Sequence, residues 1–367
     1  MSMKQKGFSL MLVISLFLLL VSCTSSPPDN GNASSSVIVV DQRGKEIVLP
    51  SSVERVVTIP FPAASLFYTI DGSSDHIVGM HPRSQEAVKE SILEDMAPML
   101  LLVNTGFIKS GFEANVEELL KLKPDVVFQW ADKGDAIITP LEEAGIPVIG
   151  LKYGTQGDLE EWMRIMGKVS GKEQRAKGLI RYHHEVENFL ISLSENLTEK
   201  RPRVLYLPYG AELKTTGQGT YNDFYINLTG GINVAHDLSD WQTVSMEQIH
   251  VWNPEIILVG NFAPLMPKDI LRNTIDGQDW AGIDAVENKR VYKAPLGGYR
   301  WDPPNQESPL MWEWLFGILH PSLTTFNLRD EMRVFYEGYY GYQLSDQDIS
   351  RILRCEVNTD KWCTAAP

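Results

Sequence analysis

The feature that most constrains the fold of this chain is a segment that occurs twice, 130 residues apart. The first copy runs from Asn115 to Phe128 and the second from Ser245 to Leu258. Each copy predicts a short helix that a proline ends, then an acidic residue and a buried strand, and in each the proline stands seven positions after a glutamate. A solenoid repeats every ~20–50 residues, so copies this far apart predict two related lobes instead.

Strand patterns alternate with helical patterns in both halves of the chain. The β-rich runs are Arg55 to Ile59, Ile77 to Met80, Asp125 to Trp130, Pro147 to Leu151, Arg203 to Leu207, Ile232 to Ala235, Ile256 to Gly260 and Arg290 to Lys293, behind a hairpin at residues 37–49. Strands that alternate with helices are typical of parallel sheets covered on both faces. The sequence therefore predicts an α/β fold with two similar three-layer α/β/α lobes, each around a central, mainly parallel sheet.

A segment without strand signals, residues 158–200, separates the two halves. Within it, Glu173 to Ser194 carries apolar residues at helical spacing and contains no proline. We expect a single long helix there, roughly 33 Å in length, that joins the lobes as a stiff strut. This places an N-terminal lobe at residues 37–157 and a C-terminal lobe, with a C-terminal extension, at residues 201–367.

The N-terminus predicts export. Phe8 to Val21 is an apolar run behind two lysines, which is typical of a signal peptide and short for a membrane span. Residues 20–23 read Leu-Val-Ser-Cys and resemble the lipobox of bacterial lipoproteins. The resemblance implies removal of residues 1–22 and attachment of lipid to Cys23. Residues 23–36 are rich in Ser, Pro, Gly and Asn and predict a flexible tether.

Composition excludes some partners. The chain has 47 acidic and 33 basic residues and a formal charge of −14, so its surface repels a phosphate backbone and we expect no nucleic-acid partner. Its three cysteines lie too far apart for a zinc cage, and we expect no metal site. In an exported protein Cys355 and Cys363 could form a disulfide or remain two free thiols, and the sequence leaves both open.

The order of these features resembles the helical-backbone substrate-binding proteins of ABC importers, within the periplasmic binding proteins. The resemblance rests on the lipobox, the Asp-x-x-Gly-x-x-Ile-x-Leu-Pro motif at residues 41–50, the duplicated element and the single interlobe helix. It implies a monomeric receptor, without a cofactor, that captures a solute between its lobes and delivers it to a membrane permease. In members of the family one glutamate on each lobe docks on the permease. The matching residues are Glu117 and Glu247, although a helix start alone also favours a carboxylate.

Ligands of open α/β sheets bind beyond the carboxyl ends of the strands. Nine residues near such positions are candidates for ligand binding: Phe61, His81, Arg83, Tyr153, Tyr209, Trp241, Tyr299, Arg300 and Trp301. The aromatic residues favour a bulky planar ligand, and Arg300 favours an anionic one. Alternatively, Arg300 braces its own loop by pairing with Asp302 or Glu307. A haem iron would take His81 or Tyr209 as its ligand.

Three further residues have two interpretations. Trp130 and Phe262 directly extend apolar strands and are expected in the core more than in the cleft. Ser308 begins a predicted helix whose free N–H groups could receive an anion.

We therefore predict an extracytoplasmic solute-binding lipoprotein of an ABC importer that captures an iron chelate, either a siderophore or haem, or cobalamin. A small oxyanion such as molybdate or tungstate is the alternative ligand. The sequence contains no nucleophile elbow, phosphate loop or zinc-protease motif, so we expect no enzyme. A secreted enzyme or a lipoprotein sensor on the same fold is the alternative of another class.

Overall fold

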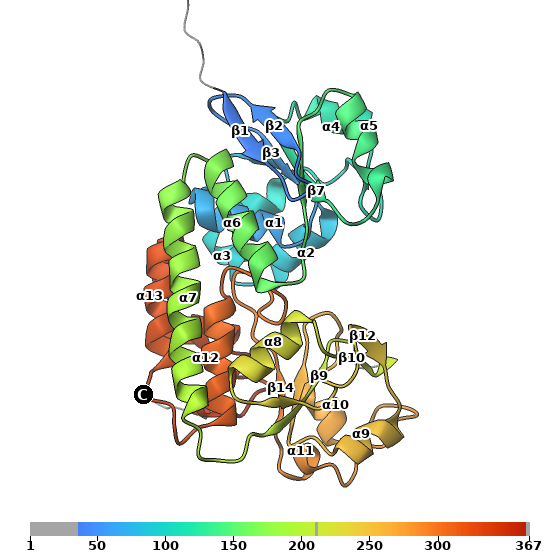
Figure 1. The fold of residues 1–367 in the computed structure, drawn as a ribbon, viewed down its shortest axis with the longest axis vertical. Coiled ribbons are helices and arrows are strands. Elements are labelled where there is room, and N and C mark those ends of the chain that lie inside the picture. The colour runs from blue at the N-terminus through green and yellow to red at the C-terminus, as the bar shows by residue number, and fades with distance from the viewer. Residues whose placement is uncertain (1–35, 210–211, 365–367) are drawn as a thin grey trace, which may run out of the picture. The chain divides into compact units, whose positions relative to one another are not determined.

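The computed structural model describes residues 36–209 and 212–364, which belong to one compact unit. Two lobes with a long helix between them make up this part of the chain (Figure 1). The expected signal peptide, the lipid site Cys23 and the tether as far as residue 35 lie outside the described residues.

The N-terminal lobe is built around four parallel strands in the order β4-β3-β7-β8. These strands are β3 (Val56–Thr58), β4 (Ile77–Met80), β7 (Val126–Trp130) and β8 (Val148–Leu151). The helices of the lobe are α1 (Ala63–Asp71), α2 (Pro82–Glu90), α3 (Leu93–Met96), α4 (Val116–Lys121), α5 (Thr139–Glu143) and α6 (Gln156–Val169). Two antiparallel pairs complete it, β1 (Val37–Val40) with β2 (Glu46–Leu49) and β5 (Ile108–Ser110) with β6 (Glu113–Ala114).

The C-terminal lobe contains four parallel strands in the order β11-β9-β13-β14. These strands are β9 (Arg203–Leu207), β11 (Ile232–Asn233), β13 (Ile256–Val259) and β14 (Val291–Lys293). The helices are α8 (Tyr221–Leu228), α9 (Met246–Trp252), α10 (Pro267–Leu271), α11 (Asp284–Glu287) and α12 (Ser308–Leu319). An antiparallel pair, β10 (Lys214–Thr216) with β12 (Trp241–Thr243), lies beside the sheet.

Both sheets have the same topology. Numbered along the chain within each lobe, the strands of both sheets lie in the order 2-1-3-4. The duplicated segment forms α4 and β7 in one lobe and α9 and β13 in the other. The predicted fold class, with two related lobes around parallel sheets, is therefore confirmed.

The acidic residue of each copy ties its strand to the first strand of the same sheet. The Asp125 carboxylate accepts a hydrogen bond from the backbone N–H of Arg55 at 2.9 Å, just before β3. In the second copy the Glu255 carboxylate accepts one from the backbone N–H of Arg203 at 2.9 Å, at the start of β9. The acidic residue therefore links two neighbouring strands in each lobe, which explains why it occurs in both copies.

Alternate residues of each strand face two different cores. In β7, Val126 and Phe128 join a cluster that spans both lobes, whereas Val127 joins a separate cluster with residues of α4 and α5. Strands β9 and β13 alternate in the same way, and their outer face packs with α9, α10 and α11. Each sheet is therefore covered on both faces, as the three-layer prediction requires.

The helix between the lobes is α7 (Glu173–Glu195), 23 residues and roughly 35 Å long. It packs against α6 of the N-terminal lobe and against α8 and α12 of the C-terminal lobe. Its buried residues include Leu179, Val186 and Leu190, which belong to the core cluster that spans both lobes. Because rotation of the lobes would have to break this continuous apolar core, the strut favours small movements.

The C-terminal extension forms helices that the sequence analysis did not predict. They are α13 (Leu328–Tyr340), α14 (Asp346–Ile352) and α15 (Lys361–Thr364). Helix α13 packs against α12 and also against α1 of the N-terminal lobe, and the hydroxyls of Thr69 and Tyr340 lie 3.3 Å apart at that contact. The extension therefore joins the two lobes a second time.

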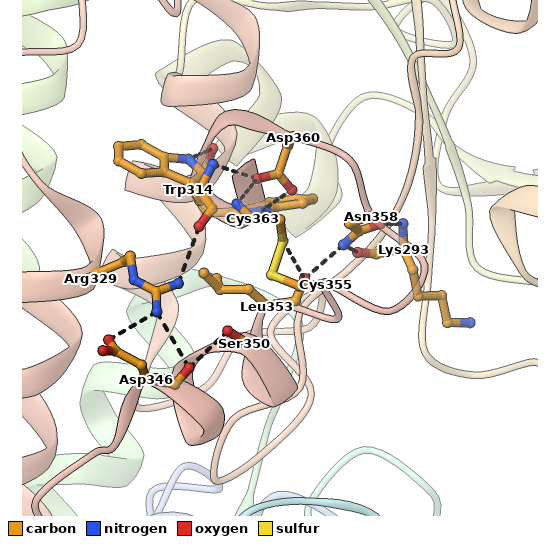
Figure 2. The surroundings of a disulfide bond; sticks show 11 residues. Lys293, Trp314, Arg329, Asp346, Ser350, Leu353, Cys355, Asn358, Asp360 and Cys363 are labelled. Carbon is orange, nitrogen blue, oxygen red and sulfur yellow. Dashed lines mark hydrogen bonds and ion pairs between the residues drawn. A yellow bond between two sulfur atoms is a disulfide. The ribbon is translucent and has the colours of Figure 1, made fainter. Parts of the chain in front are cut away.

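A disulfide between Cys355 and Cys363 closes a small loop after α14 (Figure 2). Within the loop the Asn358 amide donates to the carbonyls of Lys293 and Leu353, each at 2.8 Å. The Asn358 side chain also accepts from the backbone N–H of Lys293 at 2.8 Å. The loop is thereby attached to the end of β14.

Replacing both cysteines, Cys355→Ser with Cys363→Ser, should lower the free energy of unfolding by roughly 2–3 kcal/mol, because the cross-link restricts the unfolded chain across an eight-residue separation. Urea denaturation of the variant and of the wild type, with and without reductant, measures the change. The reduced wild type should match the variant. An unchanged midpoint in both would contradict the prediction.

Candidate ligand-binding cleft

A pocket of about 380 Å³ lies between the two lobes. The N-terminal lobe contributes Tyr153 and Thr155, which follow β8, and Asp158 in the first turn of α6. The C-terminal lobe contributes Trp241 and Phe262, together with residues 219–222 and 302–304. Tyr153 and Phe262 follow the carboxyl ends of β8 and β13, which is the edge where open α/β sheets bind ligands.

A continuous series of aromatic rings runs through the N-terminal lobe and ends at Tyr153, which lines the pocket. The ring centroids of Phe61 and His81 are 4.7 Å apart, and those of Phe61 and Phe112 are 5.2 Å apart. Phe112 is 5.6 Å from Trp130, which is 5.9 Å from Tyr153. Trp130 is only 6% exposed and supports Tyr153 from within the core, as expected.

His81 is buried, and both of its ring nitrogens are engaged. Nδ1 accepts from the backbone N–H of Arg83 at 3.0 Å, so Nε2 carries the proton and donates to the carbonyl of Gly111 at 2.8 Å. Burial lowers the pKa of His81, which keeps the ring neutral. In this arrangement His81 caps α2 and offers no nitrogen to a haem iron.

The C-terminal side of the cleft carries a cluster around Tyr209. Its ring lies 5.8 Å from Phe262 and 6.3 Å from Trp241, and the Lys214 ammonium is 5.7 Å from the rings of both Tyr209 and Trp241. Burial raises the pKa of Tyr209, and the nearby charge of Arg83 opposes the rise. Trp241 remains 43% exposed, a large apolar surface open to a ligand.

The buried carboxylate of Glu307 fixes the loop at residues 297–301 by hydrogen bonds. The carboxylate accepts hydrogen bonds from the backbone N–H of Gly298 at 2.9 Å and from the indole N–H of Trp301 at 2.5 Å. It also accepts from the hydroxyls of Tyr336 and Tyr340, at 3.0 and 2.5 Å. Trp301 has no exposed surface, so it anchors this loop and cannot touch a ligand in this conformation.

The Glu307 carboxylate also explains why glycines, Gly297 and Gly298, precede Tyr299. A Cβ atom on Gly297 would stand 1.8 Å from a Glu307 carboxylate oxygen. A side chain at this position would therefore expel Glu307. Tyr299 is 3% exposed, so Arg300 is the residue of the loop that faces outward.

Arg300 reaches across to the other lobe. Its Nη2 lies 3.3 Å from a carboxylate oxygen of Glu90, the last residue of α2, and its guanidinium lies over the ring of Phe262 at 5.6 Å. The expected alternative partners are engaged elsewhere: Asp302 accepts from the Tyr206 hydroxyl and the Asn261 amide. Arg300 therefore pairs with Glu90 of the other lobe, and within its own loop its side chain is hydrogen-bonded to that of Tyr299.

A second pocket of about 430 Å³ adjoins the first through Phe262. Arg300 lines it together with Glu90, Asn261, Lys293 and Arg354. The helix start at Ser308 was a second possible anion site, but Ser308 is fully buried and its hydroxyl accepts from the backbone N–H of Asn305.

Residues 85–296 match a sequence model of a family described as periplasmic binding protein. The chain belongs to the periplasmic binding protein family. It is a solute-binding protein of an ABC transporter, and its relatives are transport proteins.

Three relatives show how far the similarity extends. A periplasmic solute binding protein from Veillonella parvula has a TM-score of 0.83 and 38% identity, covering 88% of this chain and 98% of the other. The molybdate-binding protein MolA of Haemophilus influenzae is 25% identical over 91% of this chain and 99% of MolA; the molybdate-bound MolA structure has a TM-score of 0.73. A vitamin B12-binding protein of Yersinia pestis is 23% identical over 58% of this chain and 72% of its own length.

The two candidate docking residues of this binding protein hold equivalent positions. Glu117 and Glu247 are each the second residue of their helix, α4 and α9, and both are exposed. The caps are also alike, because Asn115 and Ser245 accept hydrogen bonds from backbone N–H groups of the first turn. Figure 1 shows both helices on the side of their lobes away from α7.

No group of three or more His, Cys, Asp or Glu side chains in the described part of the chain is placed to hold a metal ion. No helix in the described ranges has the length and apolar character to cross a membrane.

Trp301 and Trp241 were both candidates for ligand binding, but Trp301 is buried and Trp241 is exposed. Trp301→Phe removes a donor from the buried Glu307 carboxylate and should lower the free energy of unfolding by about 1–3 kcal/mol. Trp241→Phe changes an exposed ring and should leave stability unchanged, while it alters ligand affinity. Chemical denaturation of both variants is the test. Equal losses of stability would show that Trp301 has no anchoring role.

Proposed function

We propose that this protein captures a small anionic solute, an oxyanion of the molybdate type, in its interlobe cleft and delivers it to the permease of an ABC importer. The proposal rests on the position of Arg300, which lines a pocket between the lobes. A guanidinium matches the oxygen atoms of an oxyanion or carboxylate, and this one stands at the cleft on a loop fixed by Glu307. The length-wide similarity to MolA, which is named for molybdate binding, supports the same choice.

The dimensions of the site support a small ligand. The two adjoining pockets have volumes of about 380 and 430 Å³. These are at the low end of the range for small-molecule sites, ~300–1,000 Å³, and a corrinoid would need the lobes to move apart. The core that passes through α7 opposes such a movement.

An iron chelate is the second candidate, and the exposed aromatic surface favours it. Trp241, Phe262 and Tyr209 offer rings to a ligand that has planar organic groups. The carboxylates of such a chelate could use Arg300 in the same way as an oxyanion does. Haem is less favoured, because both nitrogens of His81 are engaged and because burial raises the pKa of Tyr209, which disfavours the ionised phenol that would bind iron.

Calorimetric titration with molybdate, tungstate and sulfate tests the ligand class. The wild-type protein, freed of any bound solute, should bind molybdate and tungstate and should melt at a higher temperature with them. Sulfate has the same shape and charge but is smaller, so it is the control for ligand size. If no oxyanion binds and the protein carries visible charge-transfer absorbance when purified, the ligand is an iron chelate and the oxyanion assignment is wrong.

We propose further that Glu117 and Glu247 dock on the permease. Both are exposed carboxylates at matching places in two related lobes, which suits a partner with two related halves, and exposed charges of this kind set orientation and association rate.

Reversing both charges, Glu117→Lys with Glu247→Lys, should abolish uptake by cells while solute affinity stays unchanged. The matched control is Glu185→Lys with Glu337→Lys, which changes two exposed carboxylates on α7 and α13. Uptake of radioactive solute and calorimetric affinity are both measured. Normal uptake by the docking variant would contradict the assignment.

We also propose that lipid on Cys23 anchors the protein at the extracytoplasmic face of a membrane. The support is the lipobox sequence at residues 20–23 and a matching relative from Bacillus subtilis that is named as a substrate-binding lipoprotein.

A further inference from the structure

The pocket of about 430 Å³ concentrates positive charge in a chain that is acidic overall. Three of its lining residues are cations, namely Lys293, Arg300 and Arg354, and Glu90 is the carboxylate that lines it. The whole chain has a net charge of −14. Like charges repel when they lie close together, so a cluster of three cations needs anions to be stable.

Lys293 supplies charge to the pocket and no direct donor. Its ammonium is buried and donates to the backbone carbonyls of Gly260, Ala263 and Leu265 at 2.7, 3.0 and 2.9 Å. An ammonium has three N–H donors, so all of them are used. Burial lowers the pKa of Lys293 to about 8, with the charge of Asp302 opposing and those of the two arginines adding, so it stays mostly protonated at neutral pH.

The two arginines retain unused donors. Nη2 of Arg354 donates to the Asn261 side chain at 3.2 Å, and Nη2 of Arg300 lies 3.3 Å from Glu90. The Arg300 guanidinium is also hydrogen-bonded to the Tyr299 side chain. The Nε atoms of both arginines are buried and have no hydrogen-bond partner within the described ranges. A buried N–H without an acceptor is costly, and the two guanidinium groups leave several donors for an incoming anion.

Glu90 belongs to the other lobe and is held loosely. Its side chain is 59% exposed, whereas that of Arg300 is 15% exposed. It makes a single contact with Arg300, at the mouth of the pocket. An exposed carboxylate loses little hydration when it leaves such a pair, so a soluble anion can replace it.

Arg354 is positioned by the disulfide loop. It directly precedes Cys355 and has a backbone φ of 57°, a left-handed conformation that is strained for a residue with a side chain. The loop's Asn358 is hydrogen-bonded to the backbone of Lys293 (Figure 2), so the loop holds the backbone of two of the three cations.

We propose that Arg300 and Arg354 form an anion-binding subsite whose counter-ion in the ligand-free protein is Glu90. The ligand is an anion with at least two oxygen acceptors, either an oxyanion or the carboxylates of a chelate. It displaces Glu90 from Arg300 and thereby exchanges an interlobe ion pair for a bound solute. This inference rests on the proposed function and adds Arg354 and Glu90 to the site.

Calorimetry with sodium molybdate and, in a second arm, with ferric citrate tests the subsite and distinguishes the two sources of anion. Arg354→Gln should weaken binding by roughly 10- to 100-fold, the effect of one charge-assisted hydrogen bond. Glu90→Gln should strengthen binding roughly 2- to 5-fold, because the competing carboxylate is gone. The matched control is Asp95→Asn, which removes the interlobe pair between Asp95 and Arg351 and leaves the pocket intact.

If Asp95→Asn strengthens binding as much as Glu90→Gln does, lobe closure and not competition explains the effect, and the role of Glu90 is refuted. If Arg354→Gln and Arg354→Lys both bind at wild-type strength with unchanged melting temperatures, Arg354 is not part of the site, although the proposed function stands. If the wild type binds neither probe, both the subsite and the anionic ligand are wrong.

Discussion

The buried carboxylate of Glu307 is the interaction on which the rest of this site depends. It accepts from a backbone N–H, an indole and two phenols, and so joins the loop at residues 297–301 to α12 and α13. A buried charge is tolerated only when its hydrogen bonds are satisfied, and here four donors satisfy it. The position of Arg300, the need for Gly297 and the burial of Trp301 all follow from that carboxylate.

The region around Glu307 also connects the proposed ligand site to the core that spans both lobes. Helix α13 carries two partners of Glu307 and packs on α1, and α12, which Glu307 directly precedes, packs on α7 within a core that spans both lobes. A ligand bound at Arg300 therefore contacts a part of the protein that moves little. The negative charge of the whole chain does not attract an anion, so capture depends on the local cluster of cations and on directed hydrogen bonds.

The sequence predicted those parts of the structure that follow a period. The strands of the two parallel sheets were predicted because they are short β-rich runs, and α7 was predicted because apolar residues recur there at spacings of three to four. Arg354 was missed because it comes from the extension, outside the repeat, and only the folded chain brings it to the end of β14. Lys293 left a usable signal, since a lysine that ends an apolar strand is unusual. Phe262 was expected mainly in the core because it follows β13, yet it lines both pockets.

We propose that an anion binds between the lobes at Arg300 and Arg354. Anomalous X-ray scattering from crystals of the protein grown with tungstate locates the metal directly. We expect one strong tungsten peak within hydrogen-bond reach of Arg300 and Arg354, with the Glu90 side chain turned away from Arg300. A tungsten peak elsewhere in the cleft, with the contact between Glu90 and Arg300 intact, would contradict it.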